Sequence, residues 1–140
     1  MGIAFRNAAR ISVDVWSGTI EPREAAEHVE AIAREPEWGV QGAILTDLTG
    51  IDAESRPSPE ALQVTAAMFV DRMGDRVRDA KWAVVADVTF EDATRFSNYV
   101  EATAPRLIVF NEITTACAWL GVDESEVRAI IAELRNNCSA

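Results

Sequence analysis

Side chains able to act as a base or a nucleophile are few in this sequence, and they lie far apart. The only histidine, His28, falls in a helix-like segment beside Glu27 and Glu30, on the side away from the apolar stripe of that helix. Catalytic serine and cysteine nucleophiles need a histidine within hydrogen-bond reach. The pattern therefore predicts an exposed His28, and we expect no catalytic residues in this chain.

Two aspartates, Asp47 and Asp87, fall near the ends of apolar runs that are typical of buried parallel strands. The carboxyl ends of such strands form the edge where open α/β sheets bind their ligands. The two carboxylates could hold Mg²⁺ or share a proton there, but capping of their own loops is favoured. A phospho-receiver would need a lysine ending its last strand, whereas here Phe110 is followed by Asn111 and Glu112.

Motifs for phosphates, dinucleotides and catalytic zinc are missing from the sequence. There is no G-x-G-x-x-G, no G-x-x-x-x-G-K-[ST] and no H-E-x-x-H, so we expect no cofactor. The two cysteines, Cys117 and Cys138, do not have metal-site spacing. We expect Cys117 to be buried and Cys138 to be an exposed free thiol, a pattern that suits a reducing, cytoplasmic compartment.

Length and charge narrow the class of protein further. A chain of 140 residues, 49% hydrophobic and 26% charged, predicts one globular domain spanning residues 1–140. The formal net charge of −10, from 23 acidic and 13 basic residues, disfavours nucleic acid as a partner, because binding to phosphates depends on Lys and Arg. No segment is long and apolar enough for insertion into a membrane.

Five segments have strand patterns. Apolar and polar residues alternate in Ile11–Trp16, which with Ile3–Phe5 predicts a half-solvated antiparallel hairpin at a sheet edge. Gly42–Leu48, Trp82–Val88 and Leu107–Phe110 are nearly continuous apolar runs, typical of parallel strands buried on both faces. We predict an α/β fold: a mixed, mostly parallel sheet of four to five strands, with the N-terminal hairpin at its edge, these three runs at its centre, and flanking helices.

Helical periodicity separates these strands. We expect helices over residues 22–35, 59–78, 89–104, 114–120 and 123–135. Ser58 is placed to cap the second helix, and Thr89 with Asp92 resembles a capping box at the start of the third. The polar segment Thr49–Ser58 is the longest stretch without periodicity.

Several stretches together resemble the STAS superfamily, and more narrowly its SpoIIAA-like, STAS/SEC14-type proteins. They read G-T-I-E-P-R-E-A-A at a helix entry, A-I-L-T-D-L-T-G and K-W-A-V-V-A-D-V in strands, and R-L-I-V-F-N-E-I-T-T-A-C-A-W-L at the closing strand and helix. The matching positions are Gly18, Glu24, Asp47, Leu48, Val109, Phe110, Ala116, Trp119 and Leu120. The resemblance implies a SpoIIAA-like fold and a non-enzymatic regulatory or protein-binding module. The alternative that it implies is a binding protein for a small apolar or lipid-like ligand.

Regulatory members of the superfamily carry a serine, in a D-S-S-G-type segment, that a partner kinase phosphorylates. This chain has no Asp-Ser-x-Gly at that place, and Ser55 lies closest to the expected position of the phosphoacceptor.

Binding of a protein partner or ligand is predicted at the segment Thr49–Ser58 and the adjoining strand ends, because long polar loops in compact domains are usually functional or mobile. The candidate binding residues are Asp47, Thr49, Asp52, Ser55, Arg56 and Asp87.

A homodimer is expected from apolar residues that one small core would not absorb. Trp16 is predicted to point outward from an edge strand, and the three consecutive residues Met68, Phe69 and Val70 cannot all face one core from a helix.

Overall fold

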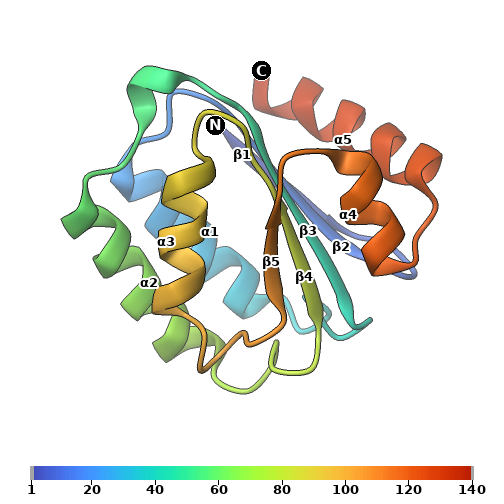
Figure 1. Cartoon of the computed structure of the whole chain (residues 1–140), viewed down its shortest axis with the longest axis horizontal. Coiled ribbons are helices and arrows are strands. Elements are labelled where there is room, and N and C mark those ends of the chain that lie inside the picture. The colour runs from blue at the N-terminus through green and yellow to red at the C-terminus, as the bar shows by residue number, and fades with distance from the viewer. Residues whose placement is uncertain (1, 140) are drawn as a thin grey trace.

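Five strands form a single mixed sheet in the computed structural model, which describes residues 2–139 (Figure 1). The strands are β1 (Ile3–Asn7), β2 (Ser12–Gly18), β3 (Ala43–Ile51), β4 (Lys81–Val85) and β5 (Leu107–Phe110). Their order in the sheet is β1-β2-β3-β4-β5; β1 runs antiparallel to β2, and the other neighbours are parallel. The predicted mixed, mostly parallel sheet with an N-terminal hairpin at its edge is confirmed.

Helices cover both faces of this sheet. They are α1 (Pro22–Arg34), the short 3₁₀ helix η1 (Ala53–Ser55), α2 (Pro59–Met73), α3 (Phe90–Tyr99), α4 (Ile113–Leu120) and α5 (Glu124–Ser139). Figure 1 shows α1, α2 and α3 on one side of the strands and α4 and α5 on the other. Two hydrophobic cores result, one on each face. Within the described residues, no helix is long and apolar enough to cross a membrane.

Strand β2 lies inside the sheet, between β1 and β3, and its first half is buried rather than half-solvated. The alternation that predicted a solvated face comes from Ser12 and Asp14, which are 0% and 3% exposed. Internal partners replace water: the Ser12 hydroxyl donates to Asn7 Oδ1 and accepts from the backbone N–H of Gly39. An alternating pattern shows that one face of a strand is polar, but not whether water or buried side chains satisfy that face. The prediction of a half-solvated β2 was therefore wrong.

Strand β5 is the second edge of the sheet, although its sequence predicted a central strand. It pairs only with β4, and Ile108 is 43% exposed. Helix α3 contacts it from one face, and α4 does so from the other. A continuous apolar run shows that both faces of a strand are covered, but not that both of its edges are paired.

Three helices end several residues from their predicted ends: α2 at Met73 and not at 78, α3 at Tyr99 and not at 104, and α5 at Ser139 and not at 135. Helix α2 ends at Met73 because Gly74 adopts a positive φ of 54°, and turns follow it. Ser58 caps its start as predicted, with its hydroxyl accepting from the N–H of Ala61 at 3.1 Å. Helix α3 begins after Thr89, but the Thr89 side chain makes no capping hydrogen bond, so the predicted capping box with Asp92 was wrong.

The two cysteines are both shielded to some degree. Cys117 is buried, as predicted, whereas Cys138 is half-buried, with its sulfur 3.7 Å from the carbonyl oxygen of Val15. Burial is the main cause that raises the pKa of both thiols. The prediction that Cys138 is an exposed thiol was therefore wrong.

Candidate functional site

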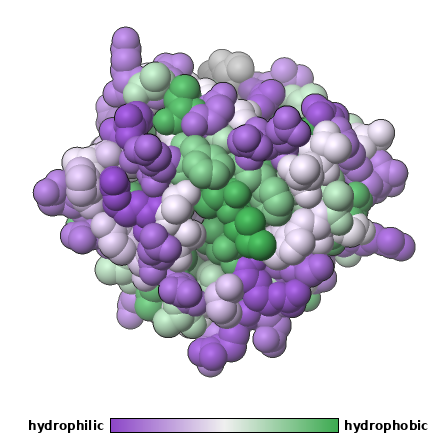
Figure 2. All heavy atoms as spheres, in the orientation of Figure 1, coloured by the Kyte–Doolittle hydropathy of each residue, from purple (hydrophilic) through white to green (hydrophobic). Residues whose placement is uncertain are grey.

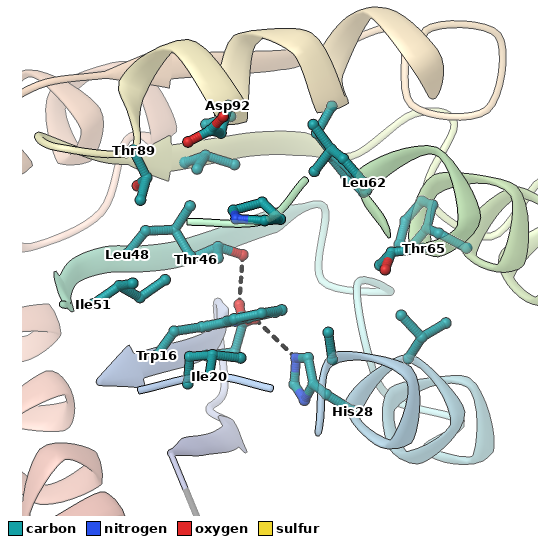
Figure 3. A pocket seen from close by; sticks show the side chains of 18 of the residues that line it. Trp16, Ile20, His28, Thr46, Leu48, Ile51, Leu62, Thr65, Thr89 and Asp92 are labelled. Carbon is teal, nitrogen blue, oxygen red and sulfur yellow. Dashed lines mark hydrogen bonds and ion pairs between the residues drawn. The ribbon is translucent and has the colours of Figure 1, made fainter. Parts of the chain in front are cut away.

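A cavity of about 160 Å³ lies between the sheet and helices α1, α2 and α3 (Figure 3). Its walls are almost entirely apolar, and two indole rings, those of Trp16 and Trp82, come from the strands. Each of the three helices presents a small or medium side chain to it, namely Ala25, Thr65 and Ala93. Larger apolar side chains from the same helices, those of Ile32, Phe69 and Phe96, complete the wall.

A chain of buried hydrogen bonds crosses the sheet side of the cavity. Trp82 Nε1 donates to Thr46 Oγ1 at 3.0 Å, and the Thr46 hydroxyl donates to Asp14 Oδ1 at 2.5 Å. The other carboxylate oxygen, Asp14 Oδ2, accepts from Trp16 Nε1 at 2.9 Å and lies 2.9 Å from His28 Nε2. The Asp14 carboxylate thus contacts three polar side chains, which come from two strands and one helix.

His28 is 7% exposed, so its predicted exposure was wrong. Besides Asp14, three aromatic rings surround the imidazole: Phe5, Trp16 and Trp38, with ring centroids 5.8, 5.4 and 6.5 Å away. Phe5 belongs to β1 and Trp38 to the connection after α1. The periodicity of α1 alone could not reveal these rings, because they come from other parts of the chain.

The pairing of His28 with Asp14 invites comparison with hydrolase triads, in which the histidine also contacts a nucleophile. Here the nearby hydroxyl, that of Thr46, donates to Asp14 and not to the imidazole. Within the described residues, no hydroxyl or thiol hydrogen-bonds to His28. The contact between His28 and Asp14 therefore joins α1 to β2.

The segment after β3 forms part of the cavity wall. Strand β3 continues to Ile51, so the first residues of the predicted polar loop belong to the sheet. Ile51, Ser55 and Pro57 line the cavity. The Ser55 hydroxyl accepts from the Ile20 N–H at 2.6 Å and donates to the Ile20 carbonyl at 3.1 Å, so phosphorylation would first require this segment to move.

Two further polar contacts hold this segment in place. Arg56 Nε donates to Asp92 Oδ2 at 2.9 Å, and the Asp92 side chain is only 6% exposed. The hydrogen bond to Asp92 and the charge of that carboxylate raise the pKa of the Arg56 guanidinium. Thr19 Oγ1 donates to Asp52 Oδ2 at 3.2 Å on the exposed side.

Asp47 and Thr49 lie on the opposite face of the sheet, toward α5. Arg135 Nη2 donates to Asp47 Oδ2 at 2.6 Å and to Thr49 Oγ1 at 2.8 Å. A second depression, of about 330 Å³, lies beside this pair. Asp87 is exposed, and its carboxylate accepts from the N–H of Val88.

The six candidate binding residues predicted from the sequence thus fall into separate places and not into one site. Ser55 lines the cavity and Arg56 holds its rim, Asp47 and Thr49 face α5, and Asp52 and Asp87 are exposed. Within the part of the chain that the structure describes, no group of three or more His, Cys, Asp or Glu could hold a metal ion.

The residues that sequence reasoning missed are Asp14, Thr46 and Thr89, all buried in the cavity wall. For Asp14 and Thr46, the sequence did contain a signal of a buried polar site. Asp14 and Thr46 are polar residues inside otherwise apolar strands, and a polar side chain in such a place must find a buried partner.

Comparison with solved structures finds a similar fold in an anti-sigma factor antagonist from Mycobacterium paratuberculosis. The two chains share 16% sequence identity with a TM-score of 0.54, and the match covers 84% of this chain and 92% of the other. No protein-family model and no curated protein matches the sequence. At this identity the likeness shows the fold alone: the chain has the α/β fold of that anti-sigma factor antagonist, in agreement with the fold that the sequence resemblance predicted.

Proposed function

We propose that this protein is a non-enzymatic regulatory module in which a small apolar molecule, bound in the cavity, sets the state of the segment after β3. The observation that carries the proposal is a shared wall, since Ile51, Ser55 and Pro57 of that segment line the cavity. A molecule in the cavity would touch the inner side of the same segment that a protein partner would contact from outside.

A protein partner is supported by the outer side of this segment and by the fold. Asp52, Glu54 and Arg56 are exposed there, and exposed loops on a rigid scaffold commonly carry binding function. The similar solved structure is named an anti-sigma factor antagonist, which describes regulation through another protein.

The contacts that hold the segment after β3 are comparable in free energy with the binding of a small apolar ligand. Contacts from Asp52, Ser55 and Arg56 hold the segment closed, and the two part-buried hydrogen bonds of the Ser55 hydroxyl contribute about 0.5–1.5 kcal/mol each. Burying apolar ligand surface contributes roughly 25 cal/mol per Å², so about 100 Å² of ligand surface is comparable with the loss of one or two such contacts. Occupancy of the cavity can therefore shift the segment between closed and open states.

Binding to the cavity is tested with toluene as the probe, measured by thermal shift and by calorimetry. We expect toluene to stabilise the wild-type protein and the Ala67→Leu variant, because Ala67 is exposed on α2. The Ala93→Leu variant fills the cavity with its larger side chain and should no longer respond. Equal toluene responses in both variants, or no response in the wild type, would contradict cavity binding.

The regulatory step is tested by hydrogen exchange of residues 52–58 with and without toluene. We expect toluene to change the exchange of this segment and to leave α5 unchanged, because α5 lies on the other face. Replacement of Asp52 to Arg56 by a Gly/Ser linker, with the fold checked by circular dichroism, should abolish the effect. Unchanged exchange in the wild type at saturating toluene would show that cavity and segment are uncoupled.

A further inference from the structure

Thr89 carries a polar group that the protein itself does not use. The residue is 3% exposed, and among the buried side-chain nitrogen and oxygen atoms of the described residues its Oγ1 alone has no hydrogen-bond partner. A buried hydroxyl without a partner is destabilising and rare in native structures. Thr89 is one of the residues that line the cavity, so a molecule bound there is the candidate partner for its hydroxyl.

Helix capping does not account for this threonine. Thr89 occupies the N-cap position of α3, where its hydroxyl would normally accept a backbone hydrogen bond, but it makes none. Asp92, the expected partner in a capping box, is held by Arg56 instead. Figure 3 shows Thr89 and Asp92 on one side of the pocket and Trp16 and His28 on the opposite side.

The remaining polar groups of the cavity wall restrict the charge of the ligand. Asp14 and Asp92 both line the cavity, and their side chains are only 4% and 6% exposed. An anionic ligand would face two buried carboxylates inside a chain whose net charge is −10. Asp14 already receives hydrogen bonds from its neighbours, whereas the buried hydroxyl of Thr89 has no hydrogen-bond partner among the described residues.

The volume restricts the size of the ligand. An engineered apolar protein cavity of about 150 Å³ binds benzene, and the cavity here, at about 160 Å³, is of the same size. We infer that the cavity binds an uncharged, mostly apolar molecule of about benzene size that places one hydroxyl or carbonyl group against the hydroxyl of Thr89. This inference rests on the proposed function and adds to it the chemical class of the ligand.

Three probes of similar size, toluene, phenol and benzoate, are each titrated by calorimetry. They distinguish apolar binding, the hydrogen bond to Thr89 and the effect of a negative charge on the ligand. For the wild type we expect phenol and toluene to bind and benzoate not to bind. In Thr89→Val, which removes the hydroxyl and keeps the shape, the preference for phenol relative to toluene should fall roughly three- to tenfold, the net effect of one neutral hydrogen bond. Thr89→Ser, which keeps the hydroxyl, should retain the wild-type preference.

The outcomes distinguish this inference from the proposed function. Equal phenol preferences in the wild type and Thr89→Val, with toluene binding intact, would overturn the role of Thr89 and leave the apolar site standing. Binding of benzoate would overturn the uncharged class. Binding of no probe would overturn both the inference and the cavity's function. Thr89→Val should be at least as stable as the wild type, because an unused buried hydroxyl is replaced by a methyl group.

A second, independent observation concerns the free edge of the sheet at β5. Natural edge strands are protected by short length, charges, proline or bulges; β5 is short, at four residues, but its sequence, Leu-Ile-Val-Phe, contains no charge and no proline. Figure 2 shows apolar side chains gathered at the centre of the face where Figure 1 places β5. The surfaces from which the sequence predicted a homodimer are less open, because Trp16 lines the cavity and Phe69 is buried.

The backbone pattern of β5 limits the registers in which two copies of the strand can pair. The carbonyls of Arg106 and Phe110 accept from the N–H groups of Trp82 and Ala86, so they point toward β4. Hydrogen-bonding direction alternates along a strand, which turns the N–H and carbonyl of Val109 toward solvent. A second copy of β5, running antiparallel about a two-fold axis at Val109, can therefore exchange both hydrogen bonds with it.

Charge complementarity supports the same register. With Val109 opposite Val109, Ile108 lies opposite Phe110 and Arg106 lies opposite Glu112 of the second copy. Arg106 and Glu112 are exposed, and the backbone of Glu112 is still extended at φ −137°, ψ 139°. We infer that two copies of this chain associate through β5, with apolar pairs at the centre and an ion pair at each end.

Sedimentation equilibrium with charge-reversal variants tests this dimer. Arg106→Glu and Glu112→Arg should each weaken dimerisation, because each places like charges opposite one another. The double variant restores opposite charges and should recover the dimer, while a merely destabilised fold would not be rescued. A wild-type monomer at micromolar concentrations and above, or a double variant weaker than both single variants, would overturn the inference.

Discussion

Replacement of Asp14 by alanine should be among the most damaging single substitutions in this protein. The carboxylate receives hydrogen bonds from Trp16 and Thr46 and pairs with His28. Trp16 is only half-buried and can turn to water, but His28 and Thr46 cannot, because they are 7% and 5% exposed. Each buried polar group left without a partner costs about 1–3 kcal/mol. For His28 and Thr46 together, and within the range for a broken buried ion pair, we expect the free energy of unfolding to fall by about 3–5 kcal/mol.

Urea unfolding measures this loss, with Asp52→Ala as the matched control. Asp52 is exposed and accepts one side-chain hydrogen bond, from Thr19, so its replacement should cost about 0.5–1 kcal/mol. Asp14→Asn keeps the shape and one acceptor oxygen, and its cost should lie between the two. If the loss of stability in Asp14→Ala is within about 1 kcal/mol of that in the Asp52→Ala control, the buried hydrogen-bond network contributes little to the stability of the fold.

Three further outcomes follow from the contacts described above. Ser55→Ala removes both hydrogen bonds to Ile20, so it should cost about 1 kcal/mol and speed hydrogen exchange of the surrounding loop; unchanged exchange would contradict this. Arg135→Ala leaves the buried Asp47 carboxylate without its cation, and urea unfolding should show a loss of about 1–3 kcal/mol. Because burial raises the pKa of the Cys138 thiol, a disulfide-exchange reagent should label it more slowly in the folded protein than in urea. The unfolded thiol loses its proton first as pH rises, so this group should lower stability in alkaline solution, and equal labelling rates in both states would contradict its burial.

The sequence by itself determined the elements and their class of fold. Alternation, apolar runs and helix periodicity are local properties, and so is the cap at Ser58, where a short polar side chain precedes Pro59. These signals predicted the five strand segments, the hairpin edge and helices on both faces, and the resemblance pointed to the STAS-like fold. Local physics suffices for such features because the interactions that set them join residues close in the chain.

Only the tertiary structure decided which polar residues share a site. Asp14 and His28 meet because α1 covers the face of the sheet on which the Asp14 side chain lies, and Thr46 reaches the same carboxylate from the neighbouring strand. The aspartates that strand ends appeared to bring together, Asp47 and Asp87, have partners elsewhere. The cavity, too, arises from the fit of three helices against one sheet, so no single segment contains it. Pairing across the fold depends on register and packing between distant segments, which the order of residues in any one segment does not encode.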